Sequence, residues 1–174
     1  MPTTDEEIMR QLMATFKLEA DEHLQAMNEL LLKLEKNQDA SQTQPLIEDI
    51  FREAHSLKGA ARAVDAALVE SVAHGIENVF AAAKRGEIEP TPGLYDLFYE
   101  ALDRITVALT SLSEGGEAIG DSDDLLKRLE EAGTGALRAA APKTARPKAE
   151  RIPKNIDVDD VREILGEKIV DSKT

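Results

Sequence analysis

Cysteine and tryptophan are absent from the 174 residues, and aromatic residues make up only 3% of them. Without cysteine the chain cannot form disulfides, hold zinc through thiolates or use a thiol nucleophile. Four Phe and two Tyr residues are too few for a platform on which nucleic-acid bases stack. No apolar run approaches the ~20 residues that cross a bilayer, and the polar, acidic start is unlike a secretory signal. These absences predict a cytoplasmic protein without membrane insertion.

Positive charge is also scarce, with 21 Lys and Arg residues against 34 Asp and Glu residues and a net charge of −13. The excess of acidic residues lies in residues 1–133, whereas residues 134–155 are basic. Nucleic-acid-binding proteins use a basic face for most of their affinity, so the acidic body argues against nucleic acid as a partner. The acidity instead indicates the well-solvated surface of a helical protein.

Apolar residues recur at spacings of three and four along residues 1–133, which is the period of amphipathic helices. The first series runs from Ile8 to Leu34 and predicts one long helix that flanks the whole bundle, with a break expected near Thr15. No segment shows the alternating β-branched residues of a strand. The predicted fold class is therefore all-α, an up-down antiparallel four-helix bundle with a fifth C-terminal helix.

Turn and capping residues set the expected limits of the later helices. Pro45 closes a polar stretch and marks the start of the second helix, and Asp65 is expected to end that helix and cap the third. Gly86 is the expected C-cap of the third helix, and Thr91–Pro92 begins the fourth. The fifth helix is expected over residues 122–132.

Composition divides the chain into three parts. Residues 1–133 form the predicted helical domain. Residues 134–155 are rich in Ala, Pro and basic residues without an apolar period, which is typical of a flexible linker. Residues 156–174 return to a weak helical period that is too short to bury a core by itself. This last segment either starts a following region or docks on another surface.

The three histidines lie in different settings. His23 stands among acidic residues of the first helix and is expected at the surface or at the rim of the core. His55 lies off the buried stripe of the second helix, where Lys58 and Arg62 share its face, and an imidazole beside two cations suits an anionic adduct. Gly59 follows one turn later and leaves room for another protein to approach, although glycine inside a helix costs about 1 kcal/mol relative to Ala.

A second pair of polar residues lies on the predicted third helix. His74 and Glu77 are three positions apart and therefore share a face. If the second and third helices are antiparallel neighbours, this pair faces His55, and a carboxylate that accepts a hydrogen bond from Nδ1–H leaves Nε2 free as the better nucleophile. Lys58 is then placed to neutralise phosphoryl oxygens.

The segment AHSLKGAARAV (54–64), with its H-x-x-K-G core, and the segment VAHGIENVF (72–80) together resemble the phosphotransfer domain at the N-terminus of CheA-type chemotaxis histidine kinases. KRGEI (84–88) and FKLEADEHL (16–24) are also similar to that family. The resemblance covers about residues 5–132. It is the combination of these segments that is specific, since each alone is short.

The resemblance implies a histidine phosphotransfer (HPt) domain that receives the γ-phosphoryl group of ATP on Nε2 of His55. A kinase ATP-binding domain would donate the group in trans, and an aspartate of a CheY-like or methylesterase-type response regulator would accept it. Lys58, His74 and Glu77 match the hydrogen-bond network of that histidine. Asp65 replaces the Gly that the family often has, so a slightly altered turn is expected. ATP and Mg²⁺ would bind to partner domains, and no cofactor or metal is expected in this chain.

The exposed face of the second helix around His55 is the expected docking surface for the receiver, with Phe51, Ser56, Gly59 and Arg62 as contact candidates. The domain is expected to be a monomer, and the full-length protein a dimer. Because no Gly-rich ATP lid occurs in the sequence, the chain is expected to be a non-autonomous fragment of a protein histidine kinase. The alternatives are a stand-alone phosphorelay shuttle that uses the same histidine, and a non-catalytic helical scaffold or metal-binding bundle.

Overall fold

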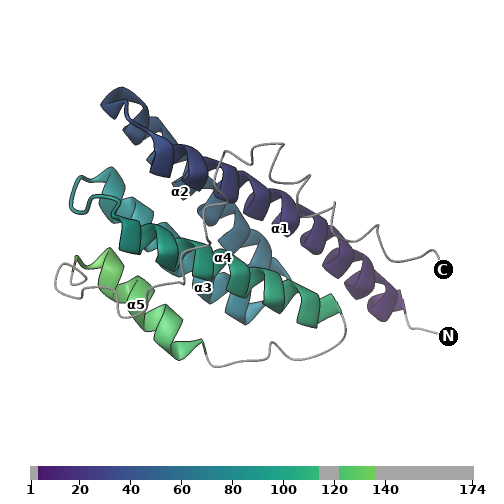
Figure 1. Cartoon of the computed structure of the whole chain (residues 1–174). Coiled ribbons are helices and arrows are strands. Elements are labelled where there is room, and N and C mark those ends of the chain that lie inside the picture. Colours follow the sequence, from purple (N-terminus) through teal and green to yellow (C-terminus); the bar gives the residue numbers. More distant parts are fainter. Residues whose placement is uncertain (1–3, 114–121, 136–174) are drawn as a thin grey trace, which may run out of the picture. The chain divides into compact units, whose positions relative to one another are not determined.

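The computed structural model describes residues 4–113 and 122–135, which form five helices and no strand (Figure 1). The helices are α1 (Thr4–Lys36), α2 (Ala40–Ala63), α3 (Ala67–Lys84), α4 (Pro92–Ser113) and α5 (Asp123–Gly133). No helix in this part of the chain is long and apolar enough to span a membrane. The predicted segment 156–174, and all of the predicted linker after residue 135, lie outside the described residues.

Each helix of the bundle packs against its neighbours in sequence. α1 contacts α2, α2 contacts α3, α3 contacts α4, and α4 closes the ring against α1. α5 lies on the outside of this ring, against α3 and α4 (Figure 1). This arrangement confirms the predicted up-down four-helix bundle with a fifth helix.

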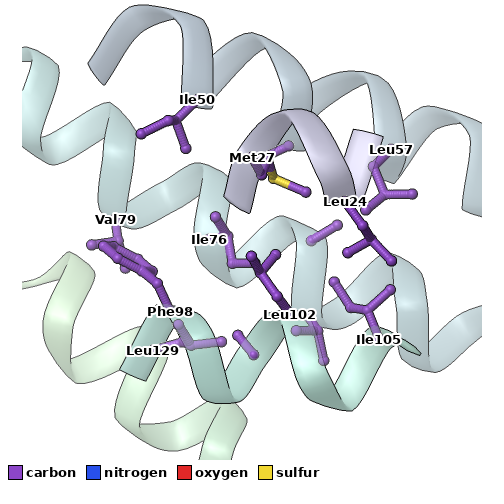
Figure 2. Packing of buried hydrophobic residues seen from close by; sticks show 14 of the residues in the cluster. Leu24, Met27, Ile50, Leu57, Ile76, Val79, Phe98, Leu102, Ile105 and Leu129 are labelled. Atoms are coloured by element: carbon purple, nitrogen blue, oxygen red, sulfur yellow. The ribbon is translucent and has the colours of Figure 1, made fainter. Parts of the chain in front are cut away.

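The core consists mainly of aliphatic side chains from all five helices, and it contains two stacked rings, Phe80 of α3 and Phe98 of α4, whose centroids are 4.5 Å apart. Figure 2 shows the labelled core residues Leu24, Met27, Ile50, Leu57, Ile76, Val79, Phe98, Leu102, Ile105 and Leu129. These residues occupy the apolar stripes that the helical period predicts. Burial of these stripes provides the main favourable term in folding.

The N-terminal turns of α1 are not covered by the other helices of the bundle. Its buried residues begin at Phe16, whereas Ile8 and Leu12 are 57% and 42% exposed. The prediction of a buried stripe is therefore wrong for these two residues, because α1 has 33 residues against 24 in α2 and 22 in α4. The expected break near Thr15 is also wrong, since the helix is continuous.

The second helix begins earlier than its proline predicts. α2 starts at Ala40, because the Asp39 side chain caps it by accepting a hydrogen bond from the backbone N–H of Ser41 at 2.9 Å. Pro45 lies inside the helix and does not mark its start. The capping network outweighs the hydrogen bond that a proline cannot make. α4 and α5 begin within one residue of their predicted starts.

Two left-handed residues end α2 and α3. Asp65 has φ 57°, and the backbone N–H of Ala66 donates to the carbonyl of Ala61 at 2.9 Å, which closes the last turn of α2. Asp65 therefore does not cap α3 as predicted, because its position is taken by this turn and Ala66 is the N-cap residue. Gly86 (φ 73°) follows the C-cap of α3, which is Arg85 and not Gly86 as predicted.

Gly75 of α3 is required by the close approach of α5. A Cβ atom on Gly75 would lie 2.9 Å from Cδ1 of Leu129, whereas a Cβ atom on Gly59 of α2 would meet nothing within 4 Å. We expect Gly75→Ala to lower the free energy of unfolding by about 1–3 kcal/mol through overpacking. Gly59→Ala, the matched control, should raise it by about 0.5–1 kcal/mol because Ala favours helix. Denaturant unfolding measures both changes, and shifts of the same sign would contradict the argument.

Candidate functional site

His55 stands on the side of α2 next to α3, with 63% of its side chain exposed to solvent. Its ring nitrogen Nδ1 lies 2.8 Å from Oε1 of Glu77, which comes from α3. A neutral imidazole that donates Nδ1–H to this carboxylate keeps its lone pair on Nε2. The packing of α2 against α3 therefore brings Nδ1 of His55 to the Glu77 carboxylate.

Glu77 is the buried member of the site, with 11% of its side chain exposed. Oε1 accepts from His55, and Oε2 forms an ion pair with Nζ of Lys58 at 2.5 Å. Burial by itself raises the pKa of Glu77, but the hydrogen bonds and charges of Lys58 and His55 outweigh burial and lower the pKa below its ordinary value. Glu77 is thus a carboxylate at neutral pH, able to orient the imidazole and to offset positive charge on it.

Lys58 lies one turn after His55 on α2, with 25% of its side chain exposed. Its ammonium contacts the same carboxylate as His55 does, so two residues of α2 hold one residue of α3. The sequence predicts that Lys58 neutralises phosphoryl oxygens. In the structure its ammonium is the counter-charge of Glu77, the carboxylate that also bonds to the imidazole.

The predicted docking residues surround His55 on the outer face of α2. The half-buried ring of Phe51 stacks with the imidazole at a centroid distance of 6.2 Å and an angle of 20°. Ser56 is exposed, and the space around Gly59 is open. Arg62 is exposed as well, with Glu70 as its ion-pair partner. All four candidates therefore lie at the surface.

His74 is the predicted site residue that the structure does not bring into the hydrogen-bonded group. It is exposed on α3, one turn before Glu77, and its side chain makes no hydrogen bond or ion pair within residues 4–113 and 122–135. His74 does lie on the same face of α3 as Glu77, as the three-residue spacing predicts. A direct bond from His74 to the other three residues is absent in this part of the chain.

His23 forms a second imidazole–carboxylate pair, which sequence reasoning missed. Its Nδ1 lies 2.7 Å from Oε2 of Glu53 on α2, and 18% of its side chain is exposed. Residues thirty positions apart give no local signal of such a contact. The Nε2 atom lies 3.9 Å from a carboxylate oxygen of Glu19, so negative charge is close to the second nitrogen. Among the described residues no three His, Asp or Glu side chains converge as metal ligands would.

The site thus consists of an exposed imidazole hydrogen-bonded to a buried carboxylate, on the flank of an up-down helical bundle. Residues 11–113 match the family model described as the Hpt domain, and the chain therefore belongs to the Hpt domain family. It is homologous to the chemotaxis protein CheA of Bacillus subtilis (strain 168), with 36% identity over 137 residues, 79% of this chain and 20% of that protein.

A further relative and a solved structure agree with this assignment. The chemotaxis protein CheA of Listeria monocytogenes is 31% identical over 112 residues, 64% of this chain and 18% of that protein, so the chain spans about a fifth of such relatives. The phosphorylated P1 domain of CheA3 in complex with CheY6 from R. sphaeroides superposes with a TM-score of 0.62 at 21% identity. It covers 72% of this chain and 97% of that chain, which shows the shared fold.

The ion pair of Glu77 with Lys58 predicts a pH-dependent contribution to stability. A carboxyl whose pKa is lowered by folding stabilises the folded state above its unfolded pKa, about 4.3, and loses this contribution as the pH falls through the folded value. We expect Glu77→Gln to lower the free energy of unfolding by about 1–3 kcal/mol at neutral pH. The difference should shrink as the pH drops below about 4.

Denaturant unfolding of Glu77→Gln at several pH values measures this dependence. The control is Glu70→Gln, which removes a partner 3.8 Å from the exposed Arg62 and should change stability little. A Glu77→Gln difference that stays constant into the acidic range would contradict the role of the charged carboxylate.

Proposed function

We propose that this chain is the phosphoacceptor domain of a CheA-type chemotaxis histidine kinase, which receives a phosphoryl group on Nε2 of His55 and passes it to a receiver aspartate. The observation that carries the proposal is the hydrogen bond between Nδ1 and the buried Glu77 on an imidazole that is 63% exposed. The CheA relatives support it, as does the structural neighbour, which was solved phosphorylated and in complex with CheY6.

The transfer consists of two substitutions at phosphorus. In the first, the Nε2 lone pair of His55 attacks the γ-phosphorus of ATP, the bond to the β–γ bridging oxygen breaks, and ADP leaves. The proton on Nδ1 stays on the ring, and its hydrogen bond to Glu77 offsets the positive charge that develops there. In the second, a carboxylate oxygen of the receiver aspartate attacks the phosphorus, and the electron pair of the broken N–P bond returns to Nε2.

The partner domains supply what this chain does not. An ATP-binding kinase domain acting in trans would hold ATP and Mg²⁺, and a CheY-like or methylesterase-type receiver would provide the accepting aspartate. The full-length protein would then be a dimer in the cytoplasm. A stand-alone shuttle would use the same histidine, but the similarity to CheA proteins favours the kinase.

Gly59 supports the approach of such a partner. A Cβ atom there would meet nothing within 4 Å, so the fold does not need a glycine at this position. A glycine inside a helix nevertheless costs about 1 kcal/mol relative to Ala. Its position one turn beyond His55 suits a surface that another protein's active site must reach closely.

The test of the acceptor residue is His55→Gln, which retains a side-chain donor for Glu77 but lacks the nucleophilic nitrogen. We expect labelling by a CheA-type kinase domain and γ-labelled ATP to be abolished. His23→Gln is the matched control and should be labelled normally, because the Nε2 atom of His23 faces Glu19. Acid-labile label that persists in His55→Gln would overturn the proposal.

The receiver-docking role of the aromatic ring beside His55 is tested by Phe51→Ala. We expect binding of a CheY-type receiver to weaken about three- to tenfold, because truncation of a central aromatic contact removes much of an interface's affinity. Leu18→Ala, at a side chain that is 64% exposed on α1, should leave binding unchanged. Calorimetry or fluorescence titration measures the affinity, and circular dichroism checks the fold. Equal affinities for the two variants would remove Phe51 from the docking surface.

A further inference from the structure

Lys84 joins the C-terminal turn of α3 to the helix that carries His55. Its Nζ atom lies 5.2 Å from the centroid of the Phe51 ring and 3.4 Å from Oε1 of Glu48, both on α2. Its backbone carbonyl accepts a hydrogen bond from Nε2 of Gln44 at 2.9 Å. From the sequence, this lysine is simply a favourable charge at a helix C-terminus.

The Phe51 ring contacts Lys84 and His55 at the same time. The ring stacks with the imidazole at 20° and 6.2 Å, and the ammonium lies over the ring within the range of a cation–π interaction. A half-buried phenyl ring at a surface has several staggered rotamers available. Contact with a fixed cation favours the rotamer in which the ring stands next to the imidazole.

The cation is itself held in place. Glu48 is one turn before Phe51 on α2, and the charge of Lys84 is the largest cause that lowers the pKa of Glu48. Lys84 and Glu48 have 41% and 37% of their side chains exposed, so this ion pair contributes little to stability by itself. The ion pair matters for geometry, because it keeps the ammonium of Lys84 near the Phe51 ring.

We propose that Lys84 is a positioning residue for phosphotransfer, which holds the Phe51 ring beside His55 and so presets the surface that the receiver domain meets. The inference rests on the function proposed above. Lys84 acts through Phe51 and does not touch the reacting atoms. Preorganisation of a docking surface lowers the ordering cost of association. Loss of Lys84 should therefore affect the KM for the receiver and leave kcat unchanged.

The test is Lys84→Met in the 174-residue chain, labelled on His55 by a CheA-type kinase domain and then mixed with a CheY-type receiver and Mg²⁺. We expect the KM of transfer to rise about two- to fivefold, the size of a partly exposed cation–π contact, at constant kcat. Lys84→Arg should restore the wild-type KM, because a guanidinium also stacks on aromatic rings.

A spectroscopic measurement separates positioning from loss of charge. The ring current of Phe51 acts on the His55 ring protons, so their NMR shifts should change in Lys84→Met. Lys127→Met removes the same charge from the exposed face of α5 and should change neither the shifts nor the KM.

The outcomes distinguish the inference from the function on which it rests. Absence of label on the wild-type chain would contradict the proposed function itself. Normal labelling with the same KM and the same NMR shifts in Lys84→Met and in wild type would overturn only the role of Lys84. An equal rise of KM in Lys84→Met and Lys127→Met would also overturn it, because net charge and not ring position would then explain the effect.

Discussion

The site depends on one carboxylate that two side chains of the neighbouring helix share. Glu77 is buried between α2 and α3, where a charge without partners would be costly, and it remains charged because His55 and Lys58 both bond to it. The same bonds fix the imidazole tautomer and its direction. The same contacts therefore satisfy two requirements. They neutralise a buried acid, which the fold requires, and they leave Nε2 free, which the chemistry requires.

The packing of the bundle core determines where this carboxylate and its partners lie relative to one another. His55 stands between two fully buried residues of α2, Ala54 and Leu57, and Glu77 follows the buried Ile76 of α3. Because these core residues fix the rotation of each helix about its axis, the two polar side chains must point toward the shared edge of α2 and α3. Close packing of the interior therefore orients His55 and Glu77, although neither residue belongs to the core cluster.

The two imidazole–carboxylate pairs differ in their exposure and in the charges around them. His23 has a carboxylate on Nδ1 as His55 does, but only 18% of its side chain is exposed, against 63% for His55. Its Nε2 atom also faces Glu19, whose charge repels an anionic phosphoryl donor. At His55 the carboxylate that holds the imidazole is also paired with the cation Lys58. Exposure and the sign of the nearby charge therefore favour His55 over His23 for the proposed phosphoacceptor role.

The sequence by itself determined the all-α class, the helix stripes and His55 as the unusual histidine, because the helical period, glycine and spacing are local properties of the chain. Tertiary structure decided which distant side chains meet. It paired Glu77 with both His55 and Lys58, left His74 outside their hydrogen bonds, joined His23 to Glu53 and exposed the first turns of α1. These outcomes follow from the relative length and rotation of packed helices, which periodicity along one helix does not encode.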